Sequence, residues 1–426
     1  MKTDLSKLIF IILFSCAVLT NSAQSNLYEP QEIDSISDVI ENFHENFLDN
    51  IEGEESRKIK KFYKNLDESL IKGLKDKRYW FDPKTSNKLD QILEVVYSSN
   101  PDLHKDKHLW LVSNSAFPNA GCYGNGIFTV NAGLFLTQLS EGEIAFIVCH
   151  ELAHLILNHS LEKISNHVVK INSKEVKEKI SSAKRKRYGS TRAGLLIYDE
   201  LRVDLLEHSK AMESEADSIG LELFEKTPYN VAYATNSLAR LRDYKERLKK
   251  KPLLLDTVFN SAGYKFKPFW TKKETSLFST DDINDYSLKS DTIETHPGIS
   301  SRVDKMITAT KIVDSLVFND KLPSVDFSIE ILEKSINSGH IDVALEMIIH
   351  YKDSQFITDR QYRSLFSKIL EKTRTLKQDH ELSKYVSVYD EFSEFYRLNE
   401  IRNVLHNISE KNLKKLLEAY NKQFNL

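Results

Sequence analysis

The stretch CHELAHLILNH, residues 149–159, places His150 and His154 four residues apart and Glu151 directly after the first histidine. Positions i and i+4 of an α-helix share a face, so both imidazoles can reach one cation. This is the HExxH arrangement, in which two histidines bind zinc and the glutamate acts as a general base. The competing interpretation is a helix that carries three histidines by chance.

The residues around this stretch favour the metal interpretation. Ser140 and Glu143 form a capping box that predicts the start of a helix, which we expect to run to about residue 170. The neighbouring segments IAFIVC (144–149) and LILN (155–158) are mostly apolar. Such flanks predict a buried helix, and buried His and Glu side chains need partners that satisfy them.

A catalytic zinc site has a third protein ligand and keeps one position for water. The metzincin pattern HExxHxxGxxH does not supply that ligand here. Leu157 and Ser160 stand where its glycine and third histidine belong, and His159 is one residue out of register. We therefore expect His159 to be structural and the third ligand to come from elsewhere.

The stretch EHSKAMESEADSIG, residues 207–220, offers the missing ligand. Glu213 and Asp217 are again four residues apart. Glu213 can reach the metal, and Asp217 can accept a hydrogen bond from a ligand histidine, whereas Glu215 points to another face. Acidic clusters are more often solvated helix faces, but small or apolar neighbours favour burial here: Met212, Ala216 and Gly220.

Taken together, these motifs resemble one protein family. The stretches HELAHLILNH, ESEAD (213–217) and THPGISSR (295–302) are similar, in this order, to the zinc metalloendopeptidases that include HtpX, the CaaX prenyl endopeptidase and the Oma-like proteases. The segment FPNAGCYGNGIFTVNAGLF (117–135) resembles the stretch ahead of the metal helix in that family. The resemblance covers about residues 100–310 and is greatest to soluble exported or Oma-like members.

The resemblance implies hydrolysis of polypeptide substrates with one zinc ion (Zn2+) per chain. It assigns the zinc ligands and the general base as follows: ligands His150, His154 and Glu213, base Glu151. Asp217 and Arg302 would support the site. His296 matches the histidine of the family's Thr-His-Pro segment, and three roles stay open for it: a latch on the zinc, a donor to the oxyanion, or an ordinary loop residue.

The chain departs from the family pattern in three respects. Lys210 stands where relatives often carry arginine, and a basic stretch at 174–192 lengthens the gap between the two metal helices. HtpX and the prenyl endopeptidase carry membrane spans that this chain lacks. These departures argue against a membrane-embedded or prenylated substrate.

The fold class expected from the residue patterns is α+β and predominantly helical, with a zincin-like core and a small sheet. Apolar spacing predicts helices over 31–100 and from about 325 to the end, and a further helix over 198–226. Thr227 and Pro228 are the expected start of the helix after that one. Strands are predicted at 108–114 and at 127–135, and we expect the strand near 126–131 to pair with an extended substrate.

Four segments are expected along the chain: a signal peptide (1–23), a helical N-terminal segment (24–100), a zinc metallopeptidase domain (101–312) and a helical C-terminal region (313–426). No regular repeat period is evident in the last region. Its helices are candidates for binding a protein partner.

The N-terminus has the layout of a secretory signal. MKTDLSK carries two lysines, the apolar run LIFIILFSCAVLT (8–20) follows, and Ala23 offers a small residue for cleavage. A membrane anchor is the alternative, but a span needs roughly 20 apolar residues. A lipid anchor through Cys16 is disfavoured, because Phe14 fits a lipobox poorly. We expect an exported, periplasmic or secreted protein with no membrane span after cleavage.

The bulk composition excludes one class of partner. The net charge of −3 provides no field that would attract nucleic acid, and the basic stretch 174–192 lacks a series of interleaved aromatic residues for stacking on bases. Cys122 and Cys149 are too few for a disulfide framework, so we expect two buried free thiols.

The predicted function is therefore a zinc-dependent metalloendopeptidase that acts on proteins of the cell envelope or exterior, with protein quality control as one role. The alternative is a non-catalytic helical binding protein with a structural metal site. Four protein ligands normally close a structural zinc site, so a permanent bond from His296 would favour the alternative.

Overall fold

The sheet and helices are taken from a computed structural model of the chain. It describes these residues: 30–49, 51–53, 55–185, 209–250, 253, 255–261, 263–272, 296, 298–311, 323–389 and 393–426. The expected signal peptide (1–23), including Cys16, lies outside the described residues, as do 186–208 and 273–295.

One sheet of four strands lies at the centre of the first half of the chain. In spatial order the strands are β1 (Tyr79–Trp80), β2 (Leu109–Ser113), β4 (Ile127–Asn131) and β3 (Ala120–Cys122). β2 and β4 are parallel, and the two outer pairs are antiparallel. Both predicted strands exist, but the second ends at Asn131 and continues into the short helix α5 (Gly133–Leu136).

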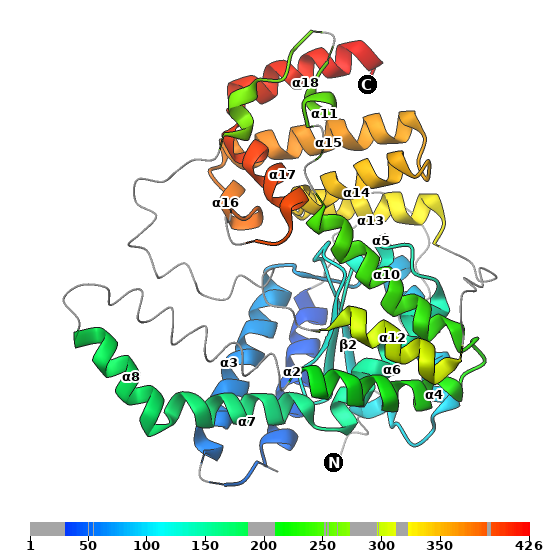
Figure 1. Ribbon diagram of the computed structural model, residues 1–426, viewed down its shortest axis with the longest axis vertical. Helices are drawn as coiled ribbons and strands as arrows, with labels where there is room; N and C mark the ends of the chain where they lie inside the picture. Colours follow the sequence, from blue (N-terminus) through cyan, green and yellow to red (C-terminus); the bar gives the residue numbers. More distant parts are fainter. Residues whose placement is uncertain are drawn as a thin grey trace.

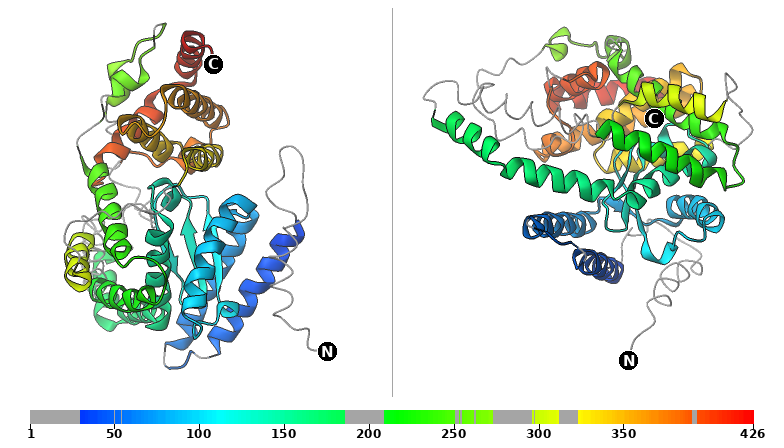
Figure 2. Two further views of the ribbon diagram at one scale, coloured as in Figure 1. Left: turned by 90° about the vertical axis from the view of Figure 1, so that its right-hand side faces the viewer. Right: turned by 60° about the horizontal axis from the view of Figure 1, so that its bottom comes forward.

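Alternating side chains give the sheet two buried faces. Leu111 and Ile127 belong to an apolar cluster with α2 (Pro30–Leu48) and α3 (Ser56–Lys75). Their chain neighbours Val112 and Phe128 point the other way and join the main core. Accordingly, α2 and α3 lie on one side of the sheet, and the helix that carries His150 and His154 lies on the other (Figures 1 and 2).

Two helices carry the main core on this second side: α4 (Pro83–Ser99) and α6 (Glu141–Ile156). The predicted capping box is present, since Ser140 Oγ accepts from the Glu143 amide and the Glu143 carboxylate accepts from the Ser140 amide. Glu143 also accepts a 2.6 Å hydrogen bond from Arg240 Nε. The start of the metal helix is therefore fixed by three polar contacts.

The single helix predicted to run to about residue 170 is instead two helices. Asn158 adopts a left-handed conformation with φ 55°, which Asn tolerates better than most residues. It separates α6 from α7 (His159–Asn172), and the two axes differ by 52°. Among the described residues no single helix is long and apolar enough to cross a bilayer, although this bent pair passes the same test by length and composition.

The predicted helix start at Thr227 is also wrong. Thr227 Oγ1 donates to the Phe224 carbonyl and so closes the preceding helix, which is described over residues 209–225. The next helix, α10 (Ala232–Lys249), begins five residues later than Thr227. Side-chain bonding to the local backbone explains the difference, because a threonine can end one helix as readily as it can begin another.

The C-terminal part is helical, as predicted. Its helices are α13 (Val325–Asn337), α14 (Ile341–Asp353), α15 (Asp359–Gln378), α16 (Leu382–Tyr385), α17 (Tyr396–Asn407) and α18 (Glu410–Phe424). They form a layer above the sheet-bearing half (Figure 1). The main core is continuous between the two, and Phe135 of α5 meets Phe327 of α13 edge-on at 5.9 Å between ring centroids.

Candidate metal centre and active site

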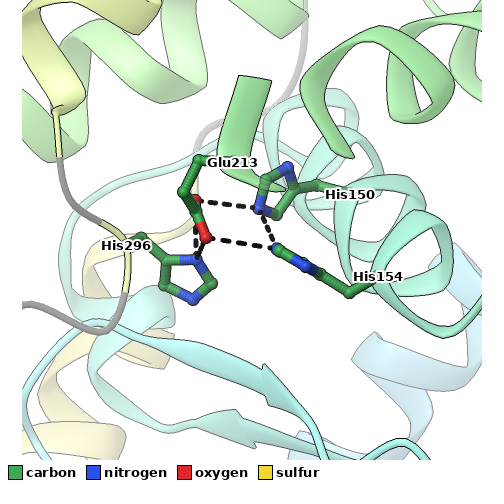
Figure 3. A group of neighbouring side chains, drawn as sticks. All are labelled: His150, His154, Glu213 and His296. Carbon is green, nitrogen blue, oxygen red and sulfur yellow. Dashed lines mark hydrogen bonds and ion pairs between the residues drawn. The ribbon is translucent and has the colours of Figure 1, made fainter. Parts of the chain in front are cut away.

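The metal helix α6 presents the three motif residues on its buried side. His150, Glu151 and His154 are each less than 9% exposed, although they can all ionise. The helix over residues 209–225 runs past them and brings Glu213, also buried, to both imidazoles. Figure 3 shows the four side chains that converge here, the fourth being His296 from the segment ahead of α12 (Ile299–Thr310).

The metal-binding atoms lie close together. His150 Nε2 and His154 Nε2 are 3.0 Å apart. Glu213 Oε2 is 3.5 Å from His150 Nε2, and Glu213 Oε1 is 3.3 Å from His154 Nε2. His296 Nδ1 is 3.0 Å from Glu213 Oε2. One ligand atom from each of the four residues lies within 4.8 Å of all the others.

These separations fit a tetrahedral zinc ion. Bonds of about 2.0–2.1 Å at tetrahedral angles place two ligand atoms about 3.3 Å apart. The measured separations of 3.0 to 3.5 Å between the two imidazoles and Glu213 bracket that value. The donor set, imidazole nitrogen with one carboxylate, is also one that zinc commonly takes. The residues present therefore fit the ion that the sequence motif predicts.

Asp217 and Arg302 support the cluster from behind. Asp217 Oδ1 lies 3.0 Å from His150 Nδ1, so a proton on that nitrogen leaves Nε2 free to bind a metal. Arg302 donates to both oxygens of Asp217 at 2.7 Å, and its Nη1 lies 2.6 Å from Glu213 Oε2. One guanidinium thus contacts the carboxylates of both Glu213 and Asp217.

The charges of these groups are set by their neighbours. Burial would raise the pKa of Asp217, but the hydrogen bonds from Arg302 and His150 outweigh it and lower that pKa to about 2. The pKa of Glu213 is likewise held well below its usual value: burial opposes the charge, and His296, His150 and His154 more than offset the burial. Both carboxylates are therefore anionic at neutral pH, as metal binding requires.

The second candidate ligand, His154, has its own supporting contact, which the sequence did not predict. His154 Nδ1 lies 3.0 Å from His159 Nδ1, and His159 Nε2 lies 3.3 Å from Glu215 Oε2. His159 is 4% exposed. It is not part of the cluster of candidate ligand atoms, but it contacts one of the residues in that cluster. The bend at Asn158 creates this contact, because a straight helix would carry the residue at i+5 away from His154.

A glycine allows the two metal helices to approach. Gly220 lies against the backbone of His150, where an added Cβ would be 3.0 Å from the His150 Cα and 3.2 Å from its nitrogen. Those contacts are with main-chain atoms, so a side chain could not be accommodated by a rotamer change. Close packing at Gly220 therefore sets how near the Glu213 helix comes to α6.

His296 lies between the cluster and the sheet. Its Nδ1 lies 3.0 Å from Glu213, and its Nε2 lies 3.5 Å from Glu151 Oε1 and 3.3 Å from the Ala120 carbonyl oxygen. Its side chain is 20% exposed, whereas that of Glu213 is only 2% exposed. Of the candidate site residues, then, all seven meet in one place, and His296 is the one most open to solvent.

The strand next to the site is β3 rather than the predicted strand near 126–131. β4 has partners on both sides, β2 and β3, so it has no edge left for a substrate. β3 is the edge strand beside α6. The main-chain groups of Asn119, directly before β3, and of Gly121 face β4. The carbonyls of the alternate residues Ala120 and Cys122 therefore point away from β4. Ser160 Oγ donates to the Cys122 carbonyl, and His296 Nε2 lies 3.3 Å from the outward carbonyl of Ala120.

Comparison with known proteins agrees with this geometry. The model of peptidase family M48 matches residues 83–310, which is more than half of the chain. A 179-residue segment is 21% identical to a protein of Vibrio cholerae serotype O1 named "Putative beta-barrel assembly-enhancing protease". That match covers 41% of this chain and 36% of the other protein, about a third of its length. The resemblance of the motifs is thereby confirmed, and the chain belongs to peptidase family M48.

Proposed function

We propose that the protein is a zinc-dependent endopeptidase in which His150, His154 and Glu213 hold the metal and Glu151 is the general base. The observation that carries this proposal is the convergence of ligand atoms within 4.8 Å of one another directly beside the buried Glu151 carboxylate. A zinc ion held there would supply Lewis acidity, which polarises a scissile carbonyl and makes water easier to deprotonate.

The protein's own residues perform the proton transfers. Glu151 accepts a proton from the attacking water at a carboxylate oxygen and delivers it to the leaving nitrogen. Asp217 and His159 keep Nδ1 of the two ligand imidazoles occupied, so that their Nε2 atoms stay available. Arg302 keeps Glu213 and Asp217 in position. An extended polypeptide can add to the outward edge of β3, where main-chain hydrogen bonds accept many sequences.

We further propose that the structure represents a latched state. His296 Nε2 lies against the Ala120 carbonyl that an extended substrate would use and near the carboxylate that must receive the water proton. Its Nδ1 simultaneously faces Glu213. The imidazole therefore occupies space that both reactants need, and it must move before a substrate can bind.

The same contacts support a second candidate function. With His296 counted, the cluster offers four ligand atoms, which is the number that closes a structural zinc site. A non-catalytic binding protein with such a site would keep His296 on the metal permanently. Two features favour the enzyme over this alternative. His296 is more exposed than the other three residues, and Glu151 would have no purpose in a closed site.

The decisive test replaces the base and a ligand separately. Glu151→Gln keeps the shape of the site but cannot accept a proton, so we expect casein cleavage to fall at least about a hundredfold while zinc content stays unchanged. Glu213→Ala should lose both zinc and activity. Full zinc occupancy in the Glu213→Ala protein, measured by atomic absorption, would contradict the ligand assignment. Undiminished cleavage by Glu151→Gln would contradict the mechanism.

We also propose that the protein is exported and acts on envelope or external polypeptides, with 24–100, 101–312 and 313–426 as successive segments after the signal peptide. The layout of residues 1–23 supports export. The name of the Vibrio cholerae relative describes that protein as a protease that enhances β-barrel assembly. Amino-terminal sequencing of the protein from its native host should find a start near Gln24, and a start at Met1 would refute cleavage.

A further inference from the structure

The side chain of Ser160 ties the edge strand β3 to helix α7. Its Oγ donates a 2.7 Å hydrogen bond to the carbonyl of Cys122, the last residue of β3. Ser160 lies in the first turn of α7 and directly follows His159, whose Nδ1 is 3.0 Å from His154 Nδ1. One helical turn therefore contacts a candidate zinc ligand through one residue and the edge strand through the next.

Close packing at Gly124 couples the same turn to the chain that leaves β3. Gly124 has a φ of 86° and lies two residues beyond Cys122. An added Cβ at this glycine would be 2.9 Å from Ser160 Cβ and 3.5 Å from the Leu161 nitrogen. Because there is no room for a side chain between them, the position of Ser160 and the position of the end of β3 depend on each other.

The hydrogen bond also shortens the edge that a substrate can use. Within β3, the carbonyls of Ala120 and Cys122 point away from β4. The Cys122 carbonyl accepts from Ser160, whose Oγ stands where a paired strand would place its N–H donor. The Ala120 carbonyl is then the outward acceptor of β3 that remains for a substrate, and it lies on the side of the metal cluster, 3.3 Å from His296 Nε2.

We infer that Ser160 is a positioning residue, which acts on a substrate through β3. By holding the Cys122 carbonyl to α7, it fixes where the Ala120 carbonyl lies relative to the metal cluster. The inference rests on the proposed peptidase function, in which that carbonyl receives the substrate main chain. Alignment of this kind matters, because a displacement of about 1 Å can lower a rate by about a hundredfold.

The inner edge of β3 is held independently of Ser160. The Asn131 amide donates to the Asn119 carbonyl, and the Tyr123 amide donates to the Ile127 carbonyl. Loss of the Ser160 hydroxyl should therefore shift the outer end of the strand without unfolding the sheet. Zinc binding should also be unaffected, because Ser160 hydrogen-bonds to β3 and is not one of the four cluster residues.

The first experiment measures binding with and without the hydroxyl. A fluorescein-labelled casein peptide is titrated against the zinc-loaded Glu151→Gln chain, and fluorescence anisotropy gives the dissociation constant. N-methylation of each peptide residue in turn removes one main-chain donor, and we expect one position, the one that donates to the Ala120 carbonyl, to lose about tenfold in affinity. Adding Ser160→Ala should weaken the unmethylated peptide by about fivefold, but the peptide methylated at that position by less than about twofold.

The control and the contradicting outcomes follow from this comparison. Ser165→Ala removes a hydroxyl that is also half-buried and belongs to the same helix, and it should change the binding of neither peptide. Equal weakening of both peptides by Ser160→Ala would show that Ser160 supports the fold as a whole, and would overturn the inference. Unchanged binding of both peptides, or the absence of any sensitive methylation position, would overturn it as well.

Cleavage separates this inference from the proposed function. In the chain with Glu151 intact, Ser160→Ala should lower kcat/KM for the same peptide by about tenfold, while the zinc dissociation constant stays at the wild-type value. An unchanged kcat/KM, or a loss of zinc, would contradict a positioning role through β3. If the wild-type chain cleaves nothing, the peptidase proposal fails, but the binding comparison still decides the role of Ser160.

Discussion

His296 makes three contacts that no ordinary loop residue would need: with the Glu213 carboxylate, with Glu151, the proposed base, and with the outward carbonyl of the edge strand. A latch must break all three for substrate to enter. A donor to the oxyanion, by contrast, would have to stay near the base during the reaction. The two roles therefore predict opposite effects of removing the imidazole.

We expect His296→Ala to raise the basal cleavage of casein several-fold, because the fraction of molecules with an open site limits the rate of a latched enzyme. His104→Ala, which removes an exposed histidine, is the control. A loss of about a hundredfold would show instead that His296 stabilises the oxyanion. An unchanged rate with zinc still bound would eliminate both roles.

His159 provides a test of the support behind His154. Replacing it by leucine removes the partner 3.0 Å from His154 Nδ1, so we expect the zinc affinity to fall by about 10- to 100-fold, as is usual for an outer partner of a metal ligand. Zinc dissociation constants are measured by competition with a chromophoric chelator. His159→Asn keeps a polar atom near the same place and should lose less. Wild-type affinity in the leucine variant would leave His159 with a packing role alone.

At the scale of the elements, the approach of the two metal helices depends on Gly220. Alanine usually stabilises the middle of a helix by about 0.5–1 kcal/mol relative to glycine. Here its Cβ would lie 3.0 Å from the His150 Cα, so the helix that carries Glu213 has to move. Overpacking of this kind costs about 1–3 kcal/mol. We therefore expect Gly220→Ala to lower the free energy of unfolding and to weaken zinc binding.

Urea unfolding and chelator competition measure the two effects. Ser218→Ala on the exposed side of the same helix should change the stability by no more than about 0.5 kcal/mol. A Gly220→Ala protein that is more stable than the wild type would show that the two helices can separate at no cost.

The helices and strands also show which features of the fold and the candidate site could be predicted from the sequence alone. Spacing of four residues predicted which side chains of α6 and of the Glu213 helix would share a face, and all of these meet in the structure. Spacing could not predict the break at Asn158, because it depends on a single residue adopting a left-handed conformation. It therefore could not bring His159 to His154. Nor could spacing show that β4 is paired with a strand on each side, since strand order is set by packing between distant segments.

At the scale of the whole molecule, one continuous core joins the metal site to the C-terminal helices. α10 lines the pocket beside Glu151, and its Arg247 donates to both oxygens of Glu346 in α14 at 3.0 and 3.1 Å. Glu346 is fully buried and the Arg247 side chain is only 16% exposed, so the pair is largely shielded from water. The helices above the sheet therefore help to position a wall of the candidate active site, and their stability bears on its shape.

Two half-buried histidines outside the site give the molecule a predicted pH dependence. Burial lowers the pKa of His108 to about 4, and burial with the nearby Arg247 and Arg397 lowers that of His350 to about 4. The unfolded chain binds these protons with a pKa of about 6.5. Between these values the unfolded state holds more protons, so stability is full above pH 6.5 and falls as the pH drops toward 4.

Urea midpoints of the chain between pH 7 and pH 4, measured with excess chelator so that zinc release does not contribute, should therefore decrease. His350→Gln removes one of the two titrations, and its decrease should be shallower than that of the wild type. Equal slopes for the two proteins would show that His350 is not held neutral in the folded state.

The spacing of the site along the chain has a consequence for biosynthesis. His150 and His154 leave the ribosome first, Glu213 and Asp217 follow, and His296 and Arg302 come last. A nascent chain that ends before residue 302 lacks the guanidinium that contacts Glu213 and Asp217. The two carboxylates therefore gain this support only when nearly three quarters of the protein has been made.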